Sequence, residues 1–158
     1  MKFELKHVNP SPGADQKELS NVVLARFGLI PRKKDAKAAF NKLLLEFYER
    51  KKQSLKDKKP ELAIMSIDEM ALYSNIKRQT MYDYLKRWLS LALIKKASFA
   101  RGNSIIRGYE LNGSNLENAF RKAETIVQQH ILRSIDYIND LQNEVKKDKL
   151  RAINQEPK

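Results

Sequence analysis

Side chains that can bind bases and phosphates are concentrated in one ten-residue stretch of the sequence. They are Lys77, Arg78, Gln79, Thr80, Tyr82 and Lys86. Arg can form two parallel hydrogen bonds with guanine, Gln can do the same with adenine, and Thr can contact a thymine methyl group. Lys supplies the positive charge that neutralises phosphates. These residue types predict a surface that binds nucleic acid.

The same stretch carries an apolar periodicity that predicts a helix over residues 77–91. Its apolar residues recur at helical spacing and share one face; they are Met81, Leu85, Trp88 and Leu89. We expect this face to lie in the core, and the polar side chains to project from the other side. The N-terminus of a helix also favours phosphate, because its first backbone N–H groups have no partner within the helix.

A second helix and a tight turn are predicted immediately before this helix. Ser66 is a good N-cap, and Glu69 completes a capping box for a helix over 67–73. Ser74 and Asn75 then end it, because both side chains compete for the backbone and Asn tolerates the left-handed conformation of a tight turn. The predicted order is therefore helix, turn, helix.

A two-stranded hairpin is predicted next, over residues 93–111, with a three-residue turn around Gly102. A short apolar run at 62–65 predicts a further strand that pairs beside this hairpin. Arg101 and Arg107 lie on the hairpin, so they can reach flanking phosphates or the minor groove, where Arg is favoured.

The run IKRQTMYDYLKRWLSLALI, residues 76–94, resembles the recognition helix and exit of the winged helix-turn-helix superfamily of DNA-binding transcriptional regulators. The resemblance covers about residues 62–111. Ala92 stands where this superfamily commonly has Gly, so we expect an exit loop that is tighter or more helical than usual. The resemblance implies DNA binding, with helix 77–91 in the major groove and hairpin 93–111 as the wing.

The positive charge of the chain is unevenly distributed. The net charge is +12; residues 31–59 and 76–107 carry +7 each, whereas residues 60–75 carry −3. An excess confined to two segments creates a directed field that attracts a polyanion. Nucleic acid is the leading candidate partner, and an anionic membrane surface is the second.

Two roles are predicted for the polar side chains on double-stranded DNA. The residues expected to read bases are Arg78, Gln79, Thr80 and Tyr82. The residues expected to hold phosphates are Lys77, Lys86, Arg101 and Arg107. Lys95 and Lys96 fit phosphate binding and the protection of an exposed strand from aggregation about equally well.

A sequence-specific transcriptional regulator is the favoured function. The alternative is a winged-helix factor whose basic face serves RNA or a replication or transcription complex; it lacks the preference of about 10³ for one duplex sequence that a regulator needs.

An enzyme is not expected, because no Gly-rich phosphate loop or acidic and His cluster appears, and Tyr82 is an ordinary recognition-helix aromatic rather than a nucleophile. We expect no metal or cofactor, since there is no Cys and His7 and His130 lie far apart in the sequence.

Three regions are predicted along the chain, in a mainly α fold with a small β-hairpin. Residues 1–30 form an N-terminal extension with a short helix at 15–27. Residues 31–112 form the winged helix-turn-helix domain, which begins with a helix over 35–55. Residues 113–158 form a long C-terminal helix with a disordered tail.

The long C-terminal helix, predicted over 116–152, carries an apolar seam. Residues at seven-residue spacing form two series, Phe120, Val127, Ser134 and Leu141, and Ile131, Ile138 and Val145. Glu124 and Ser134 interrupt the seam, which favours a broad helix packing over a strict two-stranded coiled coil. We expect a homodimer through this helix, with recognition helices about 34 Å apart. The alternative is a helix that folds back over its own domain.

The sequence also predicts a cytoplasmic protein that does not enter a membrane. Residues 1–9 lack the apolar core of a signal peptide, and no apolar run approaches the ~20 residues that a membrane span requires. Within this leader, the alternation over 2–8 favours a short edge strand.

Overall fold

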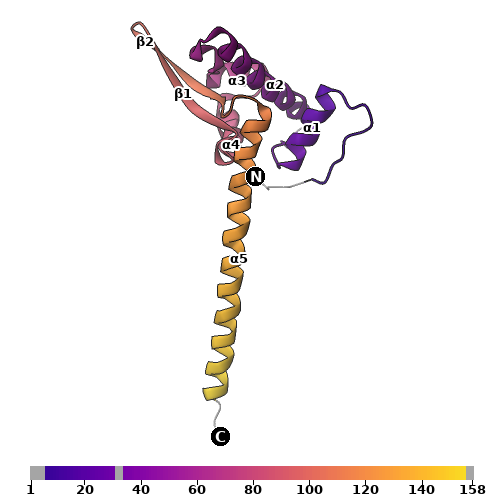
Figure 1. Cartoon of the computed structure of the whole chain (residues 1–158), viewed down its shortest axis with the longest axis vertical. Coiled ribbons are helices and arrows are strands. Elements are labelled where there is room, and N and C mark those ends of the chain that lie inside the picture. Colours follow the sequence, from indigo (N-terminus) through magenta and orange to yellow (C-terminus); the bar gives the residue numbers. More distant parts are fainter. Residues whose placement is uncertain (1–5, 31–33, 156–158) are drawn as a thin grey trace.

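The structure, a computed structural model, describes residues 6–30 and 34–155. These residues are mainly helical, with one antiparallel hairpin and a long C-terminal helix (Figure 1). The elements are α1 (Gln16–Arg26), α2 (Lys34–Asp57), η1 (Pro60–Ala63), α3 (Ile67–Ser74), α4 (Arg78–Ser90), β1 (Ile94–Arg101), β2 (Ser104–Leu111) and α5 (Leu116–Gln155). The first seven elements and the first turns of α5 form a head, and the rest of α5 extends away from it.

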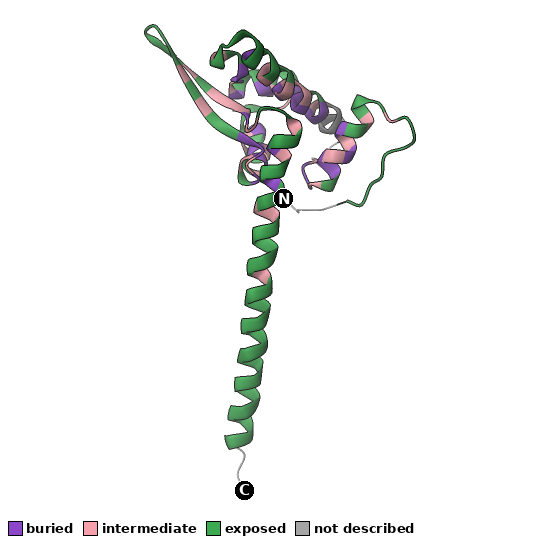
Figure 2. Cartoon of the chain, in the orientation of Figure 1, coloured by how far each residue is buried: buried purple, intermediate pink, exposed green. Residues whose placement is uncertain are grey.

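Trp88 of α4 lies at the centre of the head. It is 1% exposed, and its ring lies 6.0 Å from that of Phe40 and 6.1 Å from that of Phe47, both on α2. Met81 and Leu85 of α4 are buried in the same core. The predicted apolar face of α4 is therefore confirmed, and its first turn faces solvent. Figure 2 shows the buried residues gathered in the head.

The helix boundaries predicted from periodicity are confirmed to within about three residues. Spacing also predicts that Leu19, Val22, Val23 and Arg26 or Phe27 share one side of α1, and this side is only partly buried. Leu19 is 45% exposed, whereas Leu24 and Ala25 are buried and Leu24 belongs to the core of the head. Tertiary packing decides this rotation, because the apolar residues of α1 permit more than one face. Residues 16–30 therefore contribute to the core of the head.

The prediction of a strand at 62–65 is wrong. Residues Pro60–Ala63 form a 3-10 turn, and Met65 alone pairs with the hairpin, through two backbone hydrogen bonds of 2.8 and 2.9 Å to Tyr109. Pro60 favours the turn because its ring fixes a helical φ and it has no N–H to donate to a strand. Gly108 makes the pairing possible, since a Cβ there would lie 2.3 Å from the Met65 carbonyl oxygen.

The turn between α3 and α4 forms as predicted, with one change in the cap. Ser66 Oγ accepts a hydrogen bond from the Glu69 N–H (3.1 Å), and Asn75 has a left-handed φ of 52°. The Glu69 carboxylate, however, accepts from Arg50 Nη1 of α2 at 2.7 Å. A tertiary ion pair thus replaces the second arm of the expected capping box, and α2 holds the start of α3.

The hairpin is confirmed with a shorter turn than predicted. Arg101 pairs with Ser104, so Gly102 and Asn103 alone form the turn, and Gly102 has a φ of 61°. A two-residue turn with Gly in a positive-φ conformation at its first position matches the twist of the flanking strands. Arg101 therefore ends β1 instead of lying in the turn.

Ala92, between α4 and β1, takes the backbone conformation that Gly favours, with a φ of 55°. The sequence predicted an exit loop that is tighter or more helical than usual. The loop is not more helical, because Ala92 has a left-handed φ. This conformation costs an L-residue about 1 kcal/mol or more.

We expect Ala92→Gly to stabilise the head by about 1 kcal/mol in urea unfolding, because Gly adopts this φ without strain. Ala100→Gly, in the exposed part of β1, is the control and should destabilise by about 0.5 to 1 kcal/mol. A loss of stability in both variants would contradict this account of Ala92.

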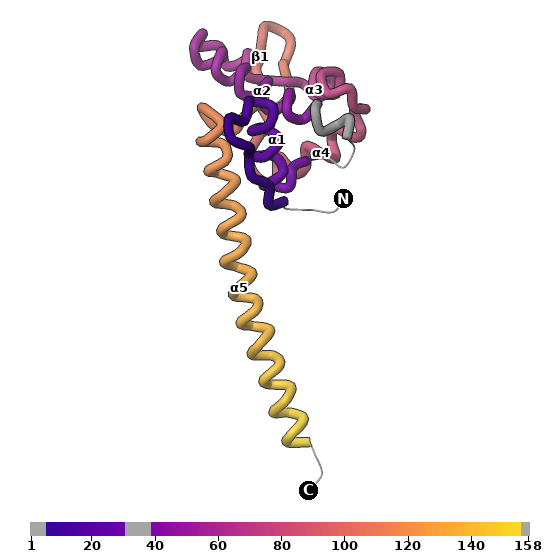
Figure 3. Tube along the Cα trace, turned by 90° about the vertical axis from the view of Figure 1, so that its right-hand side faces the viewer, coloured from indigo at the N-terminus to yellow at the C-terminus, as the bar shows by residue number. Residues whose placement is uncertain are grey.

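The long helix does not fold back over the head. In two views at right angles α5 extends away from the other elements (Figure 1 and Figure 3). Asn115 Oδ1 caps its start by accepting from the Asn118 N–H at 2.8 Å.

The leader strand predicted at 2–8 lies mostly outside the described residues, and its described part, 6–8, has no regular structure. The predicted tail also lies outside the described residues from 156 onward.

Candidate nucleic-acid interface

An open groove of about 680 Å³ lies between the starts of α3 and α4 and one face of the hairpin. The starts of α3 and α4 contribute Ser66, Ile67, Asp68, Arg78 and Tyr82; the hairpin contributes Lys96, Ala97, Ser98, Arg107, Gly108 and Tyr109. Three cations therefore converge on this groove, Arg78 from α4, Lys96 from β1 and Arg107 from β2.

The groove brings together three of the eight residues predicted to contact DNA, namely Arg78, Tyr82 and Arg107. The other five do not line it. Lys77 precedes the first residue of α4, and Gln79 and Thr80 are exposed on the first turn of that helix. Lys86 lies two turns further along, 3.5 Å from Asp83. Arg101 lies at the far end of β1.

Arg78 is already engaged on both sides within the groove. Its Nε lies 3.6 Å from Asp68 Oδ1, and its Nη2 donates to the Tyr82 hydroxyl at 3.5 Å. The guanidinium also lies 5.9 Å from the centre of the Tyr82 ring. The hydrogen bond to Tyr82 and the charge of Asp68 raise the pKa of Arg78, so it remains a cation at every physiological pH.

Lys96 was not among the predicted site residues, although its position in the strand distinguishes it from Lys95. Successive strand residues point to opposite faces of a hairpin. Lys95 Nζ lies 3.4 Å from Glu110, which also pairs with Lys51 of α2 at 3.2 Å. Lys96 lines the groove instead. Lys95 is therefore paired within the hairpin, Lys51 connects the hairpin to α2 through Glu110, and Lys96 is available to a ligand.

Asp68 is the acidic residue of the groove, and sequence reasoning missed it too. Its carboxylate is the ion-pair partner of Arg78 and is mostly exposed. A polyanion in the groove would meet this negative charge beside three positive ones. Asp68 therefore makes the groove less attractive to phosphate in general and orients Arg78 before a ligand arrives.

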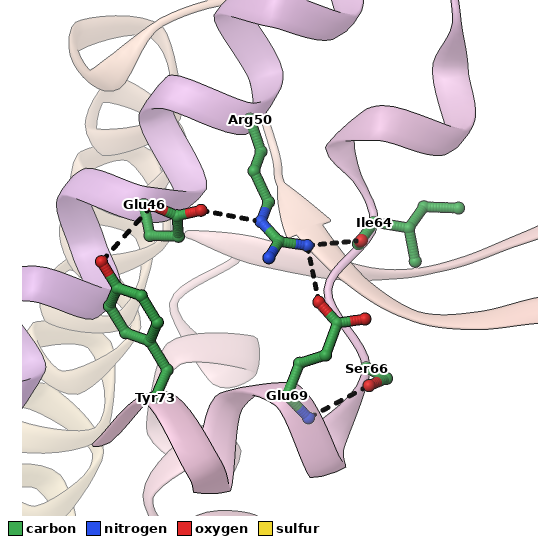
Figure 4. Close-up of polar contacts among 6 residues, drawn as sticks. All are labelled: Glu46, Arg50, Ile64, Ser66, Glu69 and Tyr73. Atoms are coloured by element: carbon green, nitrogen blue, oxygen red, sulfur yellow. Dashed lines mark hydrogen bonds and ion pairs between the residues drawn. The ribbon is translucent and has the colours of Figure 1, made fainter. Parts of the chain in front are cut away.

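A network behind the groove fixes the position of α3 (Figure 4). Arg50 of α2 binds the Glu46 carboxylate at 3.0 Å, the Glu69 carboxylate at 2.7 Å and the Ile64 carbonyl oxygen at 3.3 Å. Tyr73, at the other end of α3, donates to Glu46 at 3.4 Å, and burial together with the Glu46 charge raises its pKa. Both ends of α3 are thus tied to one turn of α2.

A contact between helices likewise fixes the far end of α4. Arg87 Nη1 donates to the Gly28 carbonyl oxygen at 2.8 Å, which connects the last turn of α4 to the end of α1. Arg87 is therefore structural, although it lies in one of the two basic segments of the chain. The anchoring of α4 at Arg87 and Trp88 leaves its first turn directed at solvent.

Comparison of the chain with protein-family models, with curated proteins and with solved structures found no match. None of the described helices is long and apolar enough to cross a membrane. Among the described residues, no three His, Cys, Asp or Glu side chains lie together as a metal ion would require.

Proposed function

We propose that this protein is a sequence-specific double-stranded DNA-binding regulator of the winged helix-turn-helix type. The observation that carries the proposal is the groove, in which Arg78 of α4 and Lys96 and Arg107 of the hairpin converge. A basic surface shared by an exposed helix start and a hairpin suits a duplex, because the helix can enter the major groove while the hairpin follows the phosphate backbone.

The shape of α4 supports its role as the reading helix. A helix with its side chains is about 10 to 12 Å across, which matches the width of the major groove of about 12 Å. The Lys77 side chain makes no capping hydrogen bond to α4, so phosphate can approach the first backbone N–H groups. The next three residues are the exposed Arg78, Gln79 and Thr80.

The proposed contacts divide into two classes. Arg78, Gln79, Thr80 and Tyr82 face base edges. The phosphate contacts are Lys77, Lys86, Lys96 and Arg107, with Arg101 reaching flanking DNA from the end of the hairpin. Arg78 must exchange Asp68 for a base when it binds, and a guanine offers it two acceptors in place of one long ion pair.

Arg78→Ala tests the reading role. If Arg78 contacts a base, the variant should bind the preferred duplex about 1 to 3 kcal/mol more weakly and lose discrimination at one position. Binding isotherms on the preferred duplex and on its single-base variants measure both effects.

Arg121→Ala on α5 is the matched control for this experiment. Arg121 is also an exposed arginine and pairs with Glu117 at 2.9 Å, but it does not line the groove. Its replacement should leave both measurements unchanged. Equal weakening of every duplex by Arg78→Ala would assign Arg78 to a phosphate and remove the reading role.

One observation favours the alternative function, a non-sequence-specific assembly factor. Leu72, at the end of α3, is 85% exposed and lies next to the half-exposed Tyr73. An apolar pair at this position suits a protein partner. An assembly factor should bind all duplexes with the same strong salt dependence, whereas a regulator should prefer one sequence by about 10³.

A further inference from the structure

Beyond its first three turns α5 has no contact that buries it. Ala119 and Ala123 are buried, and the Phe120 ring packs on Phe27 of α1 at 4.9 Å between centres. From residue 128 to residue 155 no residue of α5 is buried, and Figure 2 shows this part as an exposed rod. A helix that stands alone in water gains nothing from tertiary packing, which supplies most helical stability in proteins.

The exposed part of α5 nevertheless carries large apolar side chains on one face. The residues on this face are Ile131 (54% exposed), Ile135 (50%), Ile138 (49%), Leu141 (62%) and Val145 (50%). The same heptad series includes Phe120 and Val127, which pack against the head. One seam therefore has two parts, and only the upper part is covered by this chain.

The covered part also contains one of the two interruptions noticed in the sequence. Glu124 follows the buried Ala123 in the upper part of the helix, so it lies outside residues 131–149. Below residue 128 Ser134 interrupts the seam, and Asp148 falls at a d position near its lower end. The reason for favouring a broad packing over a two-stranded coiled coil is correspondingly weaker between these two residues, over 135–147.

We propose that residues 131–149 of α5 pair with the same residues of a second copy in a parallel, in-register coiled coil. In this heptad register Ile131, Ile138 and Val145 occupy the a positions and Leu141 occupies a d position. β-branched residues at a with Leu at d favour two parallel strands. Ser134 and Asp148, at the other two d positions, lower the stability of the pair without changing its register.

Charge complementarity selects the parallel orientation as well. Glu144 occupies a g position and Lys149 the e position of the next heptad, where the two residue types meet across a parallel pair. Glu144 would then face Lys149 of the partner subunit, and symmetry gives two such pairs. In an antiparallel pair g positions face g positions, so Glu144 would not meet the partner's Lys149.

The consequence for DNA rests on the proposed function. A parallel pair places both heads at the same end of the coiled coil, so two copies of α4 address half-sites of one inverted repeat. The spacing of these half-sites is then about 34 Å, one turn of the duplex. The pairing itself needs no DNA, so the experiments on it are done without DNA and a failure of DNA binding leaves their outcome intact.

Disulfide cross-linking tests the orientation. The chain has no Cys, so Ile131→Cys and Val145→Cys each introduce one thiol, at the two ends of the stripe. Both variants should form a covalent dimer on mild oxidation, because equivalent residues meet at both ends only in a parallel pair. Asn143→Cys, on the opposite face, should not. A cross-link at one end alone, or at neither, would overturn the proposal.

A charge exchange tests the register. Glu144→Lys and Lys149→Glu should each weaken dimerisation by about fivefold or more in sedimentation equilibrium, because each creates two like-charge pairs. The double variant should return to within about twofold of the original chain. Arg133→Glu on the outer face controls for net charge and should change little. A double variant no tighter than the single ones, or a monomer at every concentration, would contradict the pairing.

Discussion

Trp88→Ala is expected to lower the free energy of unfolding by about 3 to 5 kcal/mol, the largest single-residue effect on stability that we foresee. Trp88 is 1% exposed and contacts the rings of Phe40 and Phe47 of α2. The substitution leaves a cavity at the point where α4 meets α2, which the surrounding helices can only partly fill. Urea unfolding followed by circular dichroism measures the loss.

Trp88→Phe is the matched variant for this experiment. Phe keeps an aromatic ring in the same pocket, so the loss should be clearly smaller than with Ala. If Trp88→Ala leaves the melting temperature unchanged, α4 is rotated relative to this structure. The residues assigned to the DNA-facing side would then be wrong as well.

Replacing the three groove cations together, Arg78, Lys96 and Arg107 by Gln, is expected to abolish most DNA binding. Each such contact contributes about 1 to 3 kcal/mol, so the loss should be at least about a hundredfold at constant salt. Two of the three are assigned to phosphates, so the slope of log K against log salt should fall by about 2. Fluorescence anisotropy on one labelled duplex at several salt concentrations measures both quantities.

A control with the same change in net charge separates the groove from bulk charge. Arg133, Lys146 and Lys147 lie on exposed positions of α5, far from the groove. Their replacement by Gln also removes three positive charges, but we expect less than a threefold effect on the affinity, because screening limits their action to about 10 Å. Equal losses in the two triple variants would mean that no particular surface binds DNA.

Local patterns predicted the element that carries the proposed reading residues. The spacing of Met81, Leu85 and Trp88 sets the buried face of α4, since amphipathic periodicity is a property of consecutive residues. Ser66 predicted the start of α3, and Asn75 predicted the turn at its end. Both predictions are local, because a cap depends on residues within one turn. The orientation of Arg78 and Tyr82 toward the groove follows from these local features.

Contacts between distant segments account for what the sequence did not predict. The four apolar residues from 62 to 65 suit a strand or a tight turn equally well, and their pairing depends on Gly108, which has no Cβ to block Met65. The Glu69 carboxylate binds Arg50 of α2 rather than the backbone N–H of Ser66. Periodicity cannot predict this contact, because Arg50 and Glu69 lie on different helices. Similarly, the contact of Asp68 with Arg78 joins two helices whose relative position is set by the core.

The hairpin shows where a sharper reading of the sequence was possible. Lys95 and Lys96 are adjacent in a strand, so they had to point to opposite faces. Glu110 lies opposite Lys95 in the register and attracts it, which leaves Lys96 for the groove. The register depends on the two-residue turn at Gly102, and the expected three-residue turn obscured this distinction.

Selection of bound sequences from a random pool of duplex DNA tests the central claim most directly. The claim is that the first turn of α4 reads a sequence while the hairpin holds the backbone. We expect the original chain to enrich one motif, arranged as an inverted repeat with half-sites about 34 Å apart. Arg78→Ala should enrich a motif with one position relaxed. Retention of duplexes with no enriched motif by the original chain would contradict the claim.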